Sequence, residues 1–351
     1  MGDWVPEIDG MSASTAAPRA RLVRAFVRVG WAAFALASAT LWGCAVSAPE
    51  RGDGPSPAAV ETAIAEAFRA RQRPAADGLT LTALERPARA APARYRVIVV
   101  PGSGCAGMAP FADRYFAGLL HAEVLVLHKP WVNAYASTPA DRCSAAFVQA
   151  DTLGAWLAHA LAALRADARD REGATPLPQW LVGISEGAEL LPALAPAVPH
   201  LAGLVLIGSS GLDPREAMAL QGERQGATAQ LQALEQAQAG RLPDTAVREG
   251  RSLRYWREFW QWPLARPLLD APWPLLQVWG AEDALVPQAA YQRFRTLAQD
   301  RAAPYCARQL PGADHGLQRP GHDGVRQVWA WLEQWARAPG KGLCTGVAAP
   351  E

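Results

Sequence analysis

Five short, continuous apolar runs, separated by helical patterns, constrain the fold of this chain more than any other feature. They lie at residues 96–100, 123–128, 179–184, 201–208 and 274–280. Runs of this kind are typical of parallel strands that are covered on both faces. Apolar residues recur at helical spacing from Leu153 to Leu164 and again from Val325 to Trp335. The sequence therefore predicts an α/β protein, with a mostly parallel sheet covered by helices on both faces.

Two further segments complete this prediction. A helix at residues 58–71 and an alternating strand at 79–87 are expected to precede the first apolar run. Residues 212–272 contain no predicted strand and are first rich in Gln and Ala, then in aromatic residues. A connection of that length usually has structure and a purpose, so we expect a helical lid inserted before the strand at 274–280.

The N-terminal region has the pattern of an export signal. Four arginines between residues 19 and 28 precede an uncharged stretch at 29–43, which is short for a spanning helix. The following Leu-Trp-Gly-Cys resembles a bacterial lipobox, which implies lipidation of Cys44. We therefore expect a signal peptide at 1–43, a flexible linker at 44–57 and a main domain at 58–347. The expected location is the periplasmic side of a bacterial cell envelope, with a lipid anchor as the contact with the membrane; an uncleaved anchor is the alternative.

Four cysteines follow Cys44. An even number in an exported chain indicates disulfide bonds, with three possible connectivities. Pairing of sequence neighbours would close two loops of similar length, so Cys105–Cys143 and Cys306–Cys344 are the expected bonds. Free buried thiols in a cytosolic protein are the alternative. The spacing is not that of a zinc site, and neither a metal nor an organic cofactor is expected.

Composition excludes several classes of protein. The 351 residues are 50% hydrophobic and 19% charged, which is too apolar for a disordered chain. A net charge of +1 gives no sign of nucleic-acid binding. The chain has no apolar run of about 18 residues or more, which excludes a protein that crosses the membrane several times. No specific protein partner is predicted.

The sequence Gly-Ile-Ser-Glu-Gly at 183–187 carries the sharpest chemical signal. It follows the strand at 179–184 and precedes a helix-like segment. Glycines on both sides of Ser185 allow a tight strand-to-helix turn that exposes the hydroxyl. A catalytic serine needs a base, and the base needs an acid that orients it. Asp283 follows the strand at 274–280, and His315 lies in a glycine-flanked loop.

The order Ser185, Asp283, His315, with the motifs GISEG, GAEDALVP and GADHG, resembles the α/β-hydrolase superfamily over roughly residues 79–337. The Gly-Ser-Gly loop at 102–104 adds a similarity to secreted bacterial esterase-like hydrolases. The resemblance implies an oxyanion hole, with one donor at the amide of Glu186. By position the second donor is the amide of Ser103, with Gly104 as the alternative.

Other residues remain as alternatives. His322 is a competing base, while Asp213, Glu282 and Asp314 are competing acids. Glycines at 102, 104 and 107 also spell a dinucleotide-binding fingerprint, but the strand that follows lacks the required acidic residue at its end.

Tryptophans supply candidate walls for a substrate pocket. Trp256 and Trp260 lie in the expected lid, and Trp131 follows a strand end. Aromatic walls favour apolar or aryl substrates, although core packing is the more ordinary role for such residues. The sequence thus predicts a serine hydrolase that cleaves an ester of a small-molecule acyl substrate through an acyl-enzyme. A thioesterase or peptidase using the same residues is one alternative, and a non-catalytic envelope lipoprotein is another.

Overall fold

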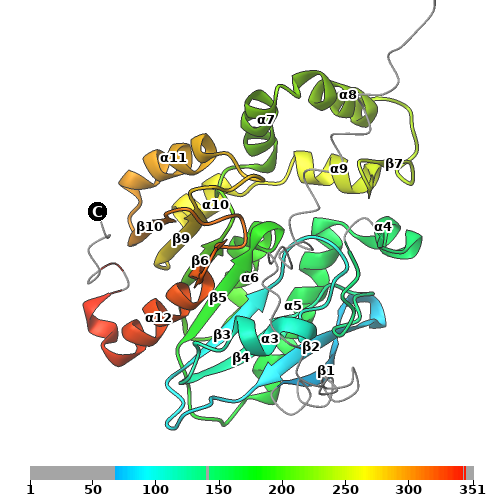
Figure 1. Cartoon of the computed structure of the whole chain (residues 1–351). Coiled ribbons are helices and arrows are strands. Elements are labelled where there is room, and N and C mark those ends of the chain that lie inside the picture. The colour runs from blue at the N-terminus through cyan, green and yellow to red at the C-terminus, as the bar shows by residue number, and fades with distance from the viewer. Residues whose placement is uncertain (1–67, 140–141, 343, 345–351) are drawn as a thin grey trace, which may run out of the picture. The chain divides into compact units, whose positions relative to one another are not determined.

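The structure is a computed structural model that describes residues 68–139, 142–342 and 344 (Figure 1). The predicted signal peptide, the linker, Cys44 and most of the predicted helix at 58–71 lie outside these residues. Within the described part of the chain, no helix is long and apolar enough to cross a membrane.

An eight-stranded sheet forms the centre of the fold. Its order is β1-β2-β4-β3-β5-β6-β9-β10. β2 pairs antiparallel with both β1 and β4, and all the other pairs are parallel. The strands are β1 (Arg69–Pro74), β2 (Thr80–Arg86), β3 (Tyr95–Val100), β4 (Ala122–Leu127), β5 (Gln179–Ile184), β6 (Leu201–Ile207), β9 (Leu275–Gly280) and β10 (Tyr305–Leu310). The five predicted apolar runs and the predicted alternating strand correspond to six of these strands, so the predicted mostly parallel sheet is confirmed.

Helices cover both faces of the sheet, as predicted. α3 (Ala109–Tyr115) and α12 (Gly324–Arg337) pack on one face, where Val97, Val99 and Val182 meet Phe116 and Trp329. The other face carries α5 (Leu153–Asp170), α6 (Leu191–Leu194), α10 (Ala265–Asp270) and α11 (Gln288–Leu297). Inner strands such as β3 and β4 contribute alternate side chains to the two clusters because successive residues of a strand point to opposite faces.

One predicted element is wrong where the structure describes it. Residues 69–71, expected at the end of a helix, belong to the edge strand β1. Most of β1 is exposed, and its arginines form ion pairs with the neighbouring strand, such as Arg71 with Glu85 at 3.1 Å. An edge strand pairs on one side only and tolerates such charged residues, so its sequence lacks the apolar pattern of an inner strand.

The segment between β6 and β9, here called the insert (residues 212–272), is mainly helical. It contains α7 (Pro214–Gln225), α8 (Thr228–Ala239), α9 (Leu253–Trp260) and α10. Figure 1 shows α7, α8 and α9 grouped beyond one end of the sheet. The expectation that this segment holds no strand is wrong in one detail, because β7 (Val247–Arg248) and β8 (Arg251–Ser252) form a short hairpin. That hairpin is too brief to leave an alternating pattern.

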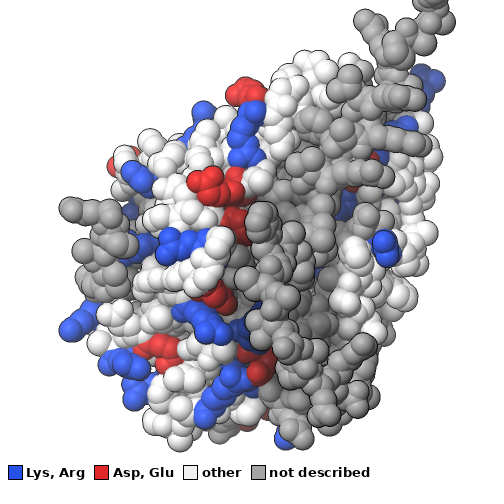
Figure 2. Space-filling view, in the orientation of Figure 1, with Lys and Arg blue, Asp and Glu red and all other residues white. Residues whose placement is uncertain are grey.

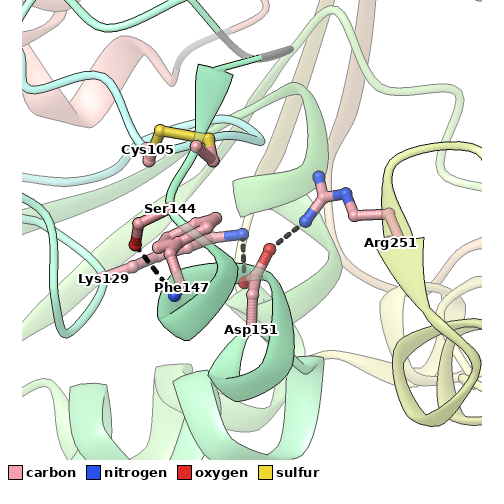
Figure 3. The surroundings of a disulfide bond; sticks show 7 residues. Cys105, Lys129, Ser144, Phe147, Asp151 and Arg251 are labelled. Atoms are coloured by element: carbon pink, nitrogen blue, oxygen red, sulfur yellow. Dashed lines mark hydrogen bonds and ion pairs between the residues drawn. A yellow bond between two sulfur atoms is a disulfide. The ribbon is translucent and has the colours of Figure 1, made fainter. Parts of the chain in front are cut away.

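Two disulfides join the four described cysteines. Cys105 bonds to Cys143, and Cys306 bonds to Cys344, with a sequence separation of 38 residues in each case. The predicted pairing is therefore found. Cys105 and Cys143 lie above the start of α4 (Ala145–Ala150), beside Phe147 (Figure 3). Disulfides of this kind fit an oxidising compartment outside the cytosol.

Charge on the visible face is mixed. Figure 2 shows Lys and Arg side chains interspersed with Asp and Glu over the described part of that face. Charged side chains also pair directly in the described part of the chain, such as Arg266 with Asp270 and Arg293 with Glu216. This distribution agrees with the formal net charge of +1.

Candidate active site

The nucleophile turn, residues 183–187, is a sharp connection between β5 and a 3-10 helix, η4 (Ser185–Leu190). Ser185 has a φ of 51°, a left-handed conformation that is uncommon outside glycine. A Cβ on Gly183 would lie 2.4 Å from the Cα of Ala188. A Cβ on Gly187 would lie 2.2 Å from the carbonyl oxygen of Val100. Gly183 therefore lets the turn fold tightly against η4, and Gly187 lets it lie in close contact with the end of β3.

Ser185, His315 and Asp283 form a continuous hydrogen-bonded chain. The Nε2 atom of His315 lies 3.0 Å from Ser185 Oγ, and its Nδ1 atom lies 2.9 Å from Asp283 Oδ2. Asp283 comes from the loop after β9 and His315 from the loop after β10. A Cβ on Gly280 would lie 2.1 Å from the Ala313 carbonyl oxygen, so glycine is required where these two loops meet. The structure thus brings together the three residues that the sequence predicts as nucleophile, base and acid.

The carboxylate of Asp283 is buried and fully hydrogen-bonded. Its Oδ1 accepts the backbone N–H groups of Leu285 and Val286 at 2.8 and 2.9 Å, and its Oδ2 accepts the Tyr291 hydroxyl at 2.7 Å. Burial alone would raise the pKa of Asp283. Its bonds to His315, Val286 and Tyr291 outweigh that effect and lower the pKa below the usual value. Asp283 is therefore ionised near neutral pH and can accept the Nδ1–H of His315.

The alternative residues lie elsewhere. Asp213 directly precedes α7, and its Oδ1 accepts two backbone N–H groups at the start of α10, at 2.6 and 2.8 Å. Glu282, Asp314 and His322 are exposed. Among the described residues, no group of three or more His, Cys, Asp and Glu side chains is arranged to hold a metal ion.

The loop after β3 lies against the nucleophile turn. A Cβ on Gly102 would be 3.3 Å from the Ile184 carbonyl oxygen and 3.5 Å from the Ser185 Cβ, so Ser103 follows directly beside the nucleophile. The amide of Glu186 lies in the first turn of η4, where N–H groups have no partner within the helix. The assignment of the Ser103 and Glu186 amides as oxyanion donors stays a prediction that agrees with this placement.

Three anchors hold the loop after β3. The Gly107 amide donates to the Ala136 carbonyl at 2.7 Å, and the Met108 amide donates to His128 Nε2 at 3.0 Å. The third anchor is the bond from Cys105 to Cys143. No sequence pattern indicated the role of His128, because a histidine at a strand end belongs to no motif.

A ring of buried ion pairs, formed by Lys129, Asp151, Glu186 and Arg251, lies next to the nucleophile turn. Lys129 Nζ lies 2.8 Å from Asp151 Oδ1 and 2.5 Å from Glu186 Oε1. Arg251 pairs with Asp151 on one side and with Glu186 Oε2, at 2.9 Å, on the other. Figure 3 shows Lys129 and Arg251 meeting Asp151 from opposite directions. The sequence motifs indicated Glu186 only through its backbone amide. No motif indicated the other three residues, which are far apart in the chain.

The candidate pocket tryptophans fall into two groups. Trp256 and Trp260 are buried in the core of the insert, packed with Leu234, Leu253 and Tyr255. Trp131 is 64% exposed, with a φ of 68°, in the loop after β4. β3, β4 and β5 are parallel, so this loop lies at the same edge of the sheet as Ser185. A contact between any of the three and a substrate stays a prediction.

No protein-family model and no curated protein sequence matches the chain. Solved structures match it in fold. A thermostable carboxyl esterase from Bacillus coagulans, in complex with glycerol, is 15% identical with a TM-score of 0.53, over 77% of this chain and 99% of that one. An esterase from Pyrobaculum calidifontis is 18% identical with a TM-score of 0.50, over 80% and 90% of the two chains.

A puromycin-hydrolysing peptidase from Mycobacterium tuberculosis is also similar. It is 16% identical with a TM-score of 0.51, and the match covers 81% of this chain. This chain spans only 41% of the length of that peptidase. At such identities the likeness establishes the fold that these proteins share, and the activity has to be argued from the site.

Proposed function

We propose that this chain, which has the α/β-hydrolase fold, is a serine hydrolase that cleaves carboxylic esters through an acyl-enzyme. The observation that carries the proposal is the hydrogen-bonded chain from Ser185 through His315 to Asp283. A serine, a histidine and an aspartate that are hydrogen-bonded in this order can remove the proton of the serine hydroxyl and so activate it as a nucleophile. The strained turn at Ser185 supports the same conclusion, because strain of this kind concentrates at functional sites.

In the first half of the reaction, Ser185 Oγ attacks the carbonyl carbon of the ester while His315 Nε2 takes the hydroxyl proton. Asp283 accepts the Nδ1–H of His315 and stabilises the imidazolium that forms. The carbonyl oxygen becomes an oxyanion, which accepts hydrogen bonds from the amides of Glu186 and Ser103. The carbon–oxygen bond to the leaving alcohol then breaks, and His315 gives its proton to that oxygen.

The second half repeats these steps with water. His315 removes a proton from a water molecule, whose oxygen attacks the acyl carbon bound to Ser185. The second oxyanion is held by the same two amides. Its collapse breaks the bond to Ser185 Oγ, which regains a proton from His315, and the carboxylic acid leaves. No other group is required for this cycle.

For the substrate we propose a small acyl ester that enters between the insert and the carboxyl edge of the sheet, with the insert acting as a lid. Trp131, exposed at that edge, is the first candidate for a substrate contact. Trp256 and Trp260 lie in the core of the insert, where their packing would stabilise the lid.

We propose that the protein is exported to the periplasmic side of a bacterial cell envelope and is anchored by a lipid on Cys44. The two disulfides support export, because such bonds persist in oxidising compartments. Mass analysis of the mature N-terminus, after expression in a bacterial host, tests this. A diacylated cysteine as the first residue would support the anchor, and an unmodified residue at another position would contradict it.

The activity is tested with a fluorophosphonate probe, which forms a covalent adduct with an activated serine. We expect one adduct per chain, on Ser185, that is lost in Ser185→Ala. The exposed Ser137 gives a matched control, since Ser137→Ala should label at the wild-type rate. A folded, disulfide-bonded wild-type protein that stays unlabelled would contradict the proposal and favour a non-catalytic lipoprotein.

The leaving group is tested separately. The purified protein should be assayed against matched ester, thioester and aminoacyl-amide substrates that carry one acyl group. The proposal expects the highest kcat/KM for the ester. A preference for the thioester or the amide would reassign the same residues to a thioesterase or a peptidase.

A further inference from the structure

The ion-pair ring joins the insert to the catalytic edge of the sheet. Lys129 lies two residues beyond β4, Asp151 is the residue that ends α4, and Glu186 belongs to the nucleophile turn. Arg251 is different, because it begins β8 within the insert. The ring is therefore a direct polar connection from the insert to the residue that follows Ser185.

The ring is balanced in charge and shielded from water. Its two cations and two carboxylates have side chains between 2 and 7% exposed. Lys129 Nζ also lies 4.3 Å from the ring centre of Trp156. Because moving an ion out of water costs free energy, each buried charge of the ring is stabilised by its oppositely charged partners. Removing the arginine would leave two buried carboxylates with one lysine, and the segments that carry them would have to move or admit water.

The carboxylate of Glu186 is the member of the ring that bears on catalysis. Lys129 donates to its Oε1, while Arg251 and the Tyr255 hydroxyl donate to its Oε2, at 2.9 and 3.0 Å. Burial raises the pKa of Tyr255 far above its usual value, so the hydroxyl stays a donor. Donors from the loop after β4 and from two elements of the insert thus fix this side chain. A fixed side chain restricts the backbone that carries it, which here includes the amide aimed at the oxyanion.

We propose that Arg251 is a positioning residue, which through the Glu186 carboxylate holds the Glu186 amide in place for the oxyanion. This inference rests on the proposed function. Arg251 does not itself touch the reacting atoms. The insert is then more than a cover over the substrate, because the oxyanion site is complete only when the insert is docked.

The test compares Arg251→Met, which removes the charge, with Arg251→Lys, which keeps it. Arg254→Met is the matched control, because Arg254 lies in the same insert with a side chain that is 58% exposed. With p-nitrophenyl butyrate, we expect kcat of Arg251→Met to fall by about 10- to 100-fold. This is less than the roughly 10²- to 10³-fold loss on removal of an oxyanion donor, because the Glu186 amide is displaced and not removed. KM should stay within about twofold, because the ground state uses the oxyanion donors weakly. The rate of fluorophosphonate labelling should fall with kcat, and Arg251→Lys should recover part of both.

A second variant covers the case in which Arg251→Met does not fold. Tyr255→Phe keeps all four charges and removes one donor to Glu186, so kcat should fall by about three- to tenfold. A purely structural role would lower the unfolding temperature and leave kcat and the labelling rate unchanged in folded protein. The inference would be overturned if folded Arg251→Met kept the wild-type kcat and the wild-type labelling rate. If only Tyr255→Phe folds, the same result in that variant would overturn it. An unlabelled wild-type protein would instead overturn the proposed function, and the inference with it.

Discussion

His128 binds the backbone on both sides of its ring, accepting the Met108 N–H at Nε2, 3.0 Å away, and donating from Nδ1 to the Thr82 carbonyl, 2.9 Å away. One acceptor and one donor require the neutral imidazole with its proton on Nδ1. Burial lowers the pKa of His128 to about 4, against the opposing effect of the bond to Thr82. The loop after β3 is therefore held by a histidine that must stay uncharged.

This gives a prediction for the pH dependence of stability. The unfolded histidine binds a proton near pH 6.5 and the folded one near 4, so its contribution is present above 6.5 and is lost as the pH falls toward 4. Between pH 7 and about 4.5 the loss should be about 2 kcal/mol in the free energy of unfolding. Urea unfolding at both pH values measures it. His128→Asn should lack this component, and His322→Asn, at an exposed site, should keep it. An equal loss of unfolding free energy between the two pH values in wild type and in His128→Asn would refute this role of His128.

A second prediction concerns the close contact at Gly187. Its Cβ position lies 2.2 Å from the carbonyl oxygens of Val100 and Pro101. Gly187→Ala should destabilise the protein by about 3 kcal/mol or more and abolish labelling of Ser185, because the turn must move away from β3. Gly340→Ala is the control, since a Cβ there meets no atom within 4 Å. Thermal unfolding and probe labelling measure the two effects, and retained labelling in Gly187→Ala would show that the turn tolerates displacement.

The two disulfides form a natural matched pair. Both have a sequence separation of 38 residues, so removing either should cost about the same stability, roughly 3–4 kcal/mol by loop entropy. Only Cys105 lies in the loop that carries Ser103. We therefore expect kcat to fall in the double variant Cys105→Ala/Cys143→Ala and to persist in Cys306→Ala/Cys344→Ala. Calorimetry and ester turnover at a temperature where both variants are folded make the comparison, and an equal loss of kcat in the two would count against it.

Trp131 supplies a prediction about substrate binding. Its side chain is 64% exposed at the edge of the sheet that carries Ser185. Trp131→Ala should raise KM for an aryl ester by about five- to thirtyfold, the equivalent of 1–2 kcal/mol, with little change in kcat or stability. Leu120→Ala is the control, because Leu120 is 45% exposed just before β4, at the opposite edge. An unchanged KM in Trp131→Ala would remove this residue from the pocket.

Amide substitutions distinguish Asp283 from Asp213 as the acid that orients His315. Asp283→Asn should lower kcat by about 10³- to 10⁴-fold, because an amide cannot stabilise the imidazolium and can favour the wrong tautomer of His315. Asp213→Asn should stay within a few-fold of wild-type kcat, since its carboxylate holds the start of α10 and does not bond to His315. The reverse result would transfer the acid role to Asp213.

Sequence patterns were sufficient for the inner strands and for the residues of the hydrogen-bonded chain. Inner parallel strands such as β3 and β5 are apolar on both faces, so their sequences stand out. β10 escaped prediction because it lies at the sheet edge, where only Cys306 and Leu310 are buried, so its sequence has no continuous apolar run. Residues 69–71 of β1 were assigned to the end of a helix, because the strand's arginines pair with Glu85 and leave no apolar face in its sequence.

Long-range polar contacts could not be predicted in the same way. Arg251 and Asp151 are 100 residues apart, and nothing in either local sequence indicates that they meet. The same holds for His128, whose two partners are backbone groups and therefore leave no trace in residue identity. The sequence motifs indicated the residues of the hydrogen-bonded chain, whereas the contacts that hold those residues in place could be identified only from the structure.

The position of the insert has a consequence for how the protein is made. Ser185 precedes the insert, whereas Asp283 and His315 follow it, and 130 residues separate the serine from the histidine. Under the proposed function, a chain that emerges from the ribosome N-terminus first therefore exposes its serine long before the base that would activate it. Until β9 and β10 join the sheet, the growing polypeptide carries an inert hydroxyl. Fragments that end within the insert should accordingly be harmless to the acyl esters of the cell that makes them.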